Sequence, residues 1–168
     1  MDQFDARAKE IVPKTKKMNG SVKGMQISSV QLLNNESQIF CNVWNPIDKK
    51  AVEQGSPFSV VIYSLGLITG WSLISTALPE HHVVIQESSV KYQKPIVGPY
   101  LLSKCCIQKQ SEEFFNVAKM KNESIKGKVS VEIRMFSVKG DNEDFVGSDQ
   151  ESEAIMTAKF HVSANPVH

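Results

Sequence analysis

The sequence has no excess of charge of either sign. Its 168 residues carry 19 Lys and Arg against 18 Asp and Glu, which gives a formal net charge of +1. A nucleic-acid surface needs an excess of basic side chains and a disordered acidic tail an excess of acidic ones, so neither is expected. The apolar fraction of 41% and the charged fraction of 22% are typical of a soluble globular protein. We expect one domain over residues 1–168.

Cysteine is scarce and has no pattern that indicates a crosslink. Cys41, Cys105 and Cys106 include one adjacent pair and no Cys-x-x-Cys pair, so neither a disulfide framework nor a structural zinc site is expected. His81 and His82 are adjacent, but no third ligand follows at a suitable spacing, so we expect no metal. The chain begins with acidic residues and no apolar signal region. We therefore expect a cytoplasmic protein.

Motifs for several common types of site are also absent. There is no Gly-x-Ser-x-Gly segment, so a Ser-His-Asp triad on a nucleophile elbow is not supported. There is no Gly-rich loop that could hold a phosphate. Internal repeats and low-complexity segments are lacking as well.

The longest uncharged segment, residues 54–79, is the most informative part of the chain. Its length alone would permit a membrane span. It carries many Ser, Thr and Gly residues, however, and the rest of the chain resembles soluble strands, so we expect a buried helix instead. Ser56 suits the N-cap and Pro57 the first helical position. With Pro79 as its end, the predicted helix covers residues 55–79.

Apolar and polar residues alternate on both sides of this helix, as in strands. The predicted strands cover residues 25–33, 39–44, 83–92, 100–108, 129–138 and 155–162. A turn at residues 34–37 makes the first two a hairpin. We expect Val129, Val131, Ile133 and Met135, and then Met156, Ala158, Phe160 and Val162, to face the core.

Two further segments complete the prediction. Residues 1–20 form an N-terminal extension, in which a short amphipathic helix is interrupted at Pro13 and followed by a polar loop. Residues 111–118 form either a helix or a bulged connection. Two strands, a long apolar helix and about four further strands are an α+β pattern. An antiparallel sheet curled around the helix would explain why the helix carries no charge.

Two segments of the predicted helix and the strand after it carry a recognisable pattern. The helix segments read Gly-Ser-Pro-Phe-Ser-Val-Val at residues 55–61 and Thr-Gly-Trp-Ser-Leu at residues 69–73, and the strand covers residues 83–96. These segments resemble a hotdog family, the thioesterase domain at the C-terminal end of some bacterial acetyltransferases (the YiiD C-terminal type). That family starts the helix with Gly-Thr-x-Phe-Gly-Gly-Ser, has Ala-Gly-Trp-Gly-Leu near its end, and has Asp-Ser, Tyr and Pro in its next strand.

The resemblance implies a hotdog fold, in which an antiparallel sheet wraps one long central helix. It also implies an acyl-thioesterase that hydrolyses an acyl-CoA or acyl-carrier-protein thioester. Coenzyme A or phosphopantetheine would be part of the substrate, and no separate cofactor is implied. We expect a homodimer or a dimer of dimers, because an open sheet has edges that must be covered.

The family pattern also implies where the substrate would bind. Free amides at the helix start could polarise a thioester carbonyl, although an ordinary capped helix start would look the same. The residues that we expect to bind substrate are Gly55, Ser56, Phe58, Ser59, Val60 and Tyr63. Tyr63 could line an acyl channel or simply pack in the core with its hydroxyl paired.

The catalytic candidates are Glu87 and Ser88, which match the family's Asp-Ser. Glu87 could instead be a solvent-facing strand residue, and Ser88 a strand hydroxyl bonded to its neighbours. Asp48 and Glu53 are better explained as solvated loop residues.

Two alternative functions remain. One is a hotdog module that binds acyl-CoA or lipid without hydrolysis, or an interaction protein, because Val60 adds bulk where the family has Gly and the helix has no carboxylate. The other is a hotdog dehydratase, which ranks last because no His lies near the helix start.

Overall fold

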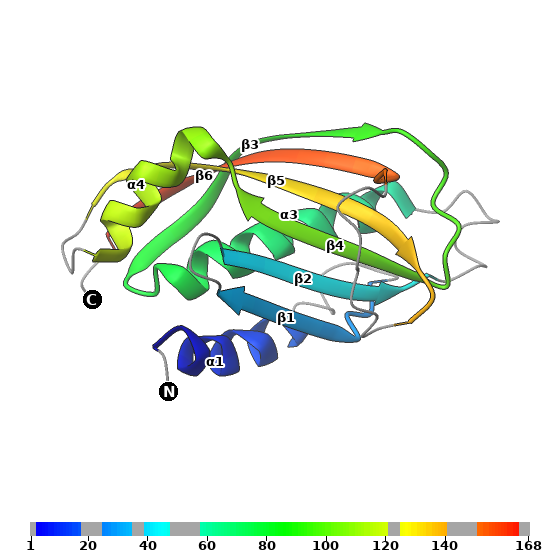
Figure 1. Cartoon of the computed structure of the whole chain (residues 1–168), viewed down its shortest axis with the longest axis horizontal. Coiled ribbons are helices and arrows are strands. Elements are labelled where there is room, and N and C mark those ends of the chain that lie inside the picture. Colours follow the sequence, from blue (N-terminus) through cyan, green and yellow to red (C-terminus); the bar gives the residue numbers. More distant parts are fainter. Residues whose placement is uncertain are drawn as a thin grey trace.

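The computed structural model describes residues 3–17, 25–34, 39–47, 58–120, 125–140 and 151–164. Three helices and six strands follow one another along these residues (Figure 1). They are α1 Gln3–Lys17, β1 Ser29–Asn34, β2 Ile39–Pro46, α3 Phe58–Ala77, β3 His81–Tyr92, β4 Tyr100–Ile107, α4 Lys109–Met120, β5 Gly127–Val138 and β6 Ala154–Ala164.

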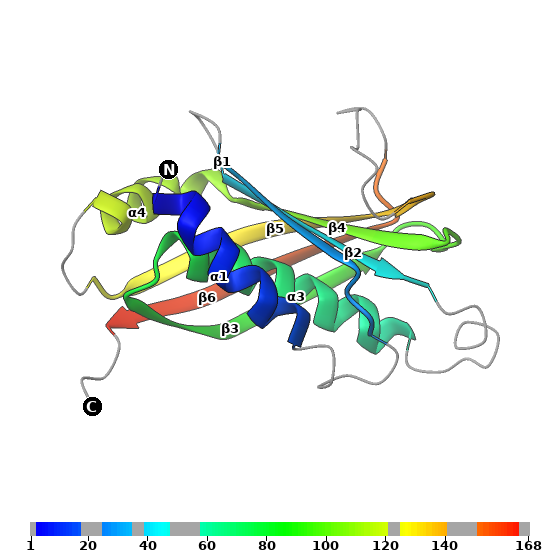
Figure 2. The ribbon, with the colours of Figure 1, turned by 90° about the horizontal axis from the view of Figure 1, so that it is seen from below.

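The six strands form one antiparallel sheet in the order β1-β2-β4-β5-β6-β3. The sheet curls around α3, and α1 lies across α3 on the side away from the sheet (Figure 2). The predicted hairpin of β1 and β2 is confirmed, and so is the α+β hotdog architecture. Strand β3 is the last in this order, beside β6, and therefore forms one edge of the sheet.

The strand faces follow the predicted alternation. The four residues of β5 and the four of β6 that were expected to face the core are buried: Val129, Val131, Ile133, Met135, Met156, Ala158, Phe160 and Val162. In β2, Cys41 and Val43 are buried in the same core. Trp44 points to the other face, where it is buried with Leu102 and Phe136 in a separate cluster.

Helix α3 is the core helix of the sheet. By length and composition its segment Val60–Ala77 could cross a membrane, but 67% of that segment is buried within the protein. Gly66 allows the helix to lie close to the sheet, since a Cβ atom there would stand 2.7 Å from both Met135 Cε and Met156 Sδ. The prediction of a buried helix is confirmed.

The hydroxyl groups of α3 join it to its neighbours. Thr69 Oγ1 lies 2.6 Å from the carbonyl oxygen of Leu65 and 2.9 Å from Ser103 Oγ on β4. Ser72 Oγ is hydrogen-bonded to Thr15 Oγ1 of α1 at 2.8 Å. These side chains are buried, so their pairing avoids the cost of an unsatisfied polar group.

The predicted interruption at Pro13 is wrong, because α1 continues through it to Lys17. Proline removes one helical hydrogen bond, but the turn around it is held by Thr15. Thr15 Oγ1 donates to the carbonyl oxygen of Ile11 at 3.0 Å and also meets Ser72. Residues 14–17, which were predicted as part of a polar loop, are therefore helical, and residues 18–23 lie outside the described residues.

Helix α4 settles the segment that the sequence left open between a helix and a bulge. It buries Ser111, Phe115 and Ala118 on one side, a spacing that fits one face of a helix. Ser111 Oγ accepts a hydrogen bond from the backbone N–H of Ser130 at 2.8 Å. The helix is thereby attached to β5.

Candidate functional site

The predicted substrate-binding residues gather at the start of α3, as far as the structure describes them. Gly55 and Ser56 lie outside the described residues. Phe58 and Ser59 begin the helix, but their side chains are also outside the description. Val60 and Tyr63 are exposed by 49% and 39%, so this end of the helix offers apolar surface.

The structure brings Tyr63 and Ser88 together. The hydroxyl of Tyr63 on α3 is in hydrogen-bonding contact with Ser88 Oγ on β3. The pair forms because β3 returns antiparallel to α3 after a short turn, in which the His81 N–H donates to the carbonyl oxygen of Leu78 at 3.1 Å. Two residues that the sequence assigned to different roles, binding and catalysis, are therefore direct neighbours.

Glu87 and Ser88 point to opposite faces of β3. Ser88 pairs with Ala158 of β6, a buried residue that faces α3. Glu87 pairs with Lys159, and its carboxylate lies 3.2 Å from Lys159 Nζ on the outer face. The structure therefore does not bring Glu87 to the Tyr63–Ser88 pair, and its predicted catalytic role remains a prediction.

A β-bulge at Gln86 causes this arrangement. The register passes from Ile85 opposite Phe160 to Glu87 opposite Lys159, which leaves Gln86 as the extra residue. If Gln86 were paired in the ladder and no bulge were present, strict alternation from Ile85 would place Glu87 on the face of α3 and Ser88 outside. The bulge thus decides which of the two side chains meets Tyr63.

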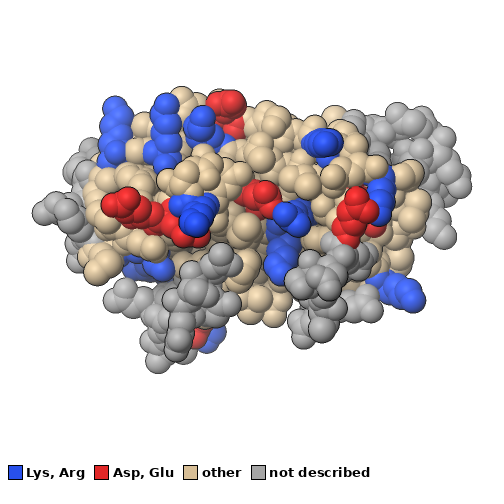
Figure 3. All heavy atoms as spheres, turned by 45° about the horizontal axis from the view of Figure 1, so that its top comes forward, with Lys and Arg blue, Asp and Glu red and all other residues tan. Residues whose placement is uncertain are grey.

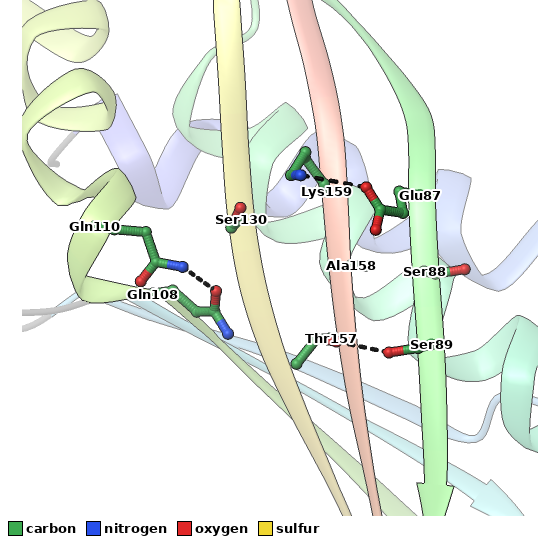
Figure 4. A pocket seen from close by; sticks show the side chains of 9 residues that line it. All are labelled: Glu87, Ser88, Ser89, Gln108, Gln110, Ser130, Thr157, Ala158 and Lys159. Carbon is green, nitrogen blue, oxygen red and sulfur yellow. Dashed lines mark hydrogen bonds and ion pairs between the residues drawn. The ribbon is translucent and has the colours of Figure 1, made fainter.

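The outer face beside Glu87 is a shallow polar groove (Figure 4). Ser89 and Thr157 are hydrogen-bonded there at 2.9 Å, next to the Glu87–Lys159 ion pair. Over the face shown in Figure 3, acidic and basic side chains are interspersed and form no large area of one sign. This face thus has no basic surface of the kind that nucleic acid requires.

The inner face beside Ser88 is polar only through hydroxyls and amides. Helix α3 has no acidic residue in its first turn and no basic residue in its last, and its sequence carries no charge at all. The first N–H groups of a helix have no partner within it and form the positive end of its dipole. Tyr63 lies five residues after Phe58, about 7.5 Å along the helix axis. Hydroxyl donors and free amides therefore lie close together.

An exposed apolar surface surrounds the Tyr63–Ser88 pair. Val60 and Tyr63 of α3 and Ile85 and Tyr92 of β3 are all at least 39% exposed. Partial burial nonetheless raises the pKa of Tyr92, so its phenol stays protonated at neutral pH. Within the described residues, no group of three or more His, Cys, Asp or Glu side chains could hold a metal ion.

Comparison with known proteins decides the family. The model of a family described as "Putative thioesterase (yiiD_Cterm)" matches residues 1–148. The chain belongs to this family. Thioesterases act on thioesters, so the family implies a thioester substrate. The matched residues include helix α1. No curated protein matches the chain.

Solved structures of similar fold cover nearly the whole chain. A protein of unknown function from Pseudomonas aeruginosa, described as a probable thioesterase, has a TM-score of 0.63 at 11% identity, with 94% of this chain and 95% of that chain covered. A putative thioesterase from Shewanella oneidensis has a TM-score of 0.59 at 17% identity, with 94% and 99% covered. A protein of unknown function from Chlorobaculum tepidum TLS has a TM-score of 0.61 at 15% identity, with 94% and 97% covered. At such identities the likeness shows the fold.

Proposed function

We propose that the chain is an acyl-thioesterase that hydrolyses an acyl group carried by coenzyme A or by acyl carrier protein. The observation that supports this most is the Tyr63–Ser88 contact beside the start of α3, in a chain of a thioesterase family. Apolar surface for an acyl chain and donors for a carbonyl oxygen lie side by side there. The proposed site therefore consists of the helix start, Tyr63 and Ser88.

The proposed reaction is addition of water to the thioester carbonyl. The α3 amides accept the developing negative charge on the carbonyl oxygen, and the Ser88 and Tyr63 hydroxyls orient the water. The C–S bond then breaks, the sulfur leaves as the thiol with one proton of the attacking water, and the acyl group leaves as a carboxylate whose second proton passes to the solvent. Among the described residues, neither α3 nor the inner face of β3 places a carboxylate beside the pair, so no carboxylate base enters this proposal.

The site is proposed to work in a homodimer that joins the β3 edges of two chains. Strand β3 is twelve residues long and lies at the edge of the sheet, and such an edge invites pairing with a second chain. Ile85 and Tyr92 of β3 and Val60 of α3 add exposed apolar surface beside it, as interfaces often do. A partner seated on this surface would also shield the Tyr63–Ser88 pair and its bound water from bulk solvent. Assembly as a dimer of dimers remains an expectation.

The experiment that tests the activity uses a panel of acyl-CoA thioesters of increasing acyl-chain length. The free thiol released from each thioester is measured over time. Turnover of at least one member that falls in the Ser88→Ala variant supports the proposal. If no member of the panel is hydrolysed, the proposal of thioesterase activity is wrong.

A second candidate function is acyl-CoA or lipid binding without hydrolysis. The Glu87 carboxylate faces away from the pair, and Val60 stands exposed near the helix start; both observations favour it. Calorimetry that detects acyl-CoA binding while the hydrolysis panel stays silent would select this function.

A further inference from the structure

A second cavity lies at the other end of α3. Its volume is about 330 Å³, and it is enclosed by α1, the second half of α3 and the start of β3. The contact between α1 and α3 that encloses it can be followed in Figure 2. Trp71 lines this cavity and lies eight residues beyond Tyr63, about 12 Å along the helix axis. We call this space the α1 cavity, and it is separate from the proposed thioester site.

Basic side chains outnumber acidic ones in the wall of the α1 cavity. Arg7 and Lys14 of α1 contribute two fixed positive charges, and Glu10 contributes one negative charge. Glu10 is already engaged, because its carboxylate lies 3.0 Å from Lys14 Nζ. Two basic side chains against one acidic one give the wall residues a formal charge of the sign that suits an anion.

His81 supplies unused hydrogen-bonding capacity to the same wall. Both of its ring nitrogens are shielded from solvent, and neither has a hydrogen-bond partner among the described residues. A neutral imidazole carries one donor and one acceptor, and buried polar atoms are normally paired. A small turn of the His81 ring toward the α1 cavity would let a polar ligand there supply the partner that the described protein groups do not.

Apart from Ser75 and His82, the rest of the wall is apolar. Trp71 contributes an aromatic ring, while Ile11 and Val83 contribute aliphatic surface. A volume of this size lies at the lower end of the range for small-molecule sites. Mostly apolar walls with a few placed polar groups are also the usual composition of such sites.

We propose that the α1 cavity binds a small organic anion, in which one carboxylate or phosphate group is attached to an apolar body. Arg7 and His81 bind the anionic oxygens, and Trp71 packs against the body. A carboxylate is also the product class of the proposed thioester hydrolysis, and only this link rests on that function. The cavity itself does not depend on turnover.

Trp71 makes the test direct, because the chain has two tryptophans and the other, Trp44, is 2% exposed. In a Trp44→Phe background, fluorescence reports on Trp71 alone. The probes are benzoate, phenyl phosphate and the uncharged benzyl alcohol. We expect a saturable change with benzoate or phenyl phosphate and none with benzyl alcohol, and the two anions distinguish a carboxylate from a phosphate site.

Matched variants on α1 locate the binding. Arg7→Gln should weaken the binding of the anion about tenfold, the effect of losing one charge-assisted hydrogen bond. Lys16→Gln, an exposed lysine of the same helix outside the cavity wall, should leave it unchanged. Binding of benzyl alcohol as tight as that of the anions, no saturable signal, or equal loss in both variants would overturn the proposal. Because no substrate turns over in this test, a silent hydrolysis panel does not affect it.

Discussion

The Tyr63 hydroxyl on α3 meets Ser88 Oγ on β3. Replacing either hydroxyl should lower kcat/KM for the best acyl-CoA by about 10²-fold, the effect of losing a group that positions a reactant, here the attacking water. Steady-state kinetics of Ser88→Ala and Tyr63→Phe would measure this.

Ser89 provides a matched control, since it is the next residue on β3 but is hydrogen-bonded to Thr157 on the outer face. Ser89→Ala should keep wild-type kinetics. Equal losses of kcat/KM in Ser88→Ala and Ser89→Ala would mean that both substitutions disturb strand β3 and that the inner hydroxyl has no specific role.

Glu87 should be dispensable for turnover. Its carboxylate is paired with Lys159 on the outer face, and its side chain is 72% exposed. We expect Glu87→Gln to retain kcat and to change the free energy of unfolding by about 0–1 kcal/mol, as for other exposed ion pairs. A fall in kcat as large as that of Ser88→Ala would instead return Glu87 to the catalytic role predicted from the sequence.

The proposed dimer should depend on the apolar edge of β3. Ile85→Lys puts a charge on this surface, where Ile85 is 40% exposed, and should yield monomers in analytical ultracentrifugation. Val97→Lys is the control, because Val97 is 79% exposed in the connection from β3 to β4. If wild type sediments as a monomer at micromolar concentration, the dimer proposal fails.

Gly66 should resist substitution. A Cβ atom there would meet the side-chain ends of Met135 and Met156 at 2.7 Å. Both methionines are fully buried, so they have little room to move aside, and overpacking costs about 1–3 kcal/mol, against the gain of about 1 kcal/mol that alanine brings to a helix. Gly66→Ala should therefore lower the denaturant midpoint. Gly140→Ala should not, because nothing lies within 4 Å of a Cβ at that position.

The buried thiols predict a loss of stability in alkali. Burial raises the pKa of both Cys41 and Cys105, so the native state holds their protons more tightly than the unfolded chain does. Their contribution is complete below the unfolded thiol pKa of about 8.5 and declines as the pH rises above it. Urea unfolding between pH 7 and pH 10 should show this decline. The Cys41→Ala/Cys105→Ala variant, although less stable overall, should show a smaller one.

Much of the fold could be predicted from the sequence, because its strongest signals are local. The uncharged segment predicted as a helix contains α3. The alternation of apolar and polar residues correctly predicted that Val129 and Phe160 are buried in the core. The prediction at Pro13 was wrong because a tertiary contact offsets the local cost of proline in a helix. This contact joins Thr15 to Ser72, which lies 57 residues further along the chain. Helix propensity depends on neighbouring residues and takes no account of contacts between distant ones.

The candidate site was predicted less completely for a similar reason. The family pattern pointed to Ser88, and Tyr63 was a candidate from its place on the predicted helix, yet their contact requires the return of β3 along α3. The bulge at Gln86 has no marker such as Gly or Pro in the sequence. Alternation alone therefore could not tell which of Glu87 and Ser88 faces the helix.

Gln86 sets the face that every later residue of β3 takes. Because it is the one residue without a partner between Ile85 and Glu87, removing it would leave a regular ladder in which Glu87 still lies opposite Lys159 and Ser88 opposite Ala158. If Gln86 were instead paired within the ladder, the two faces would exchange, so that Glu87 met Tyr63 and Ser88 turned outward. A pocket lined by hydroxyls and one lined by an acid thus differ here by the register of one strand, without a change in any side chain.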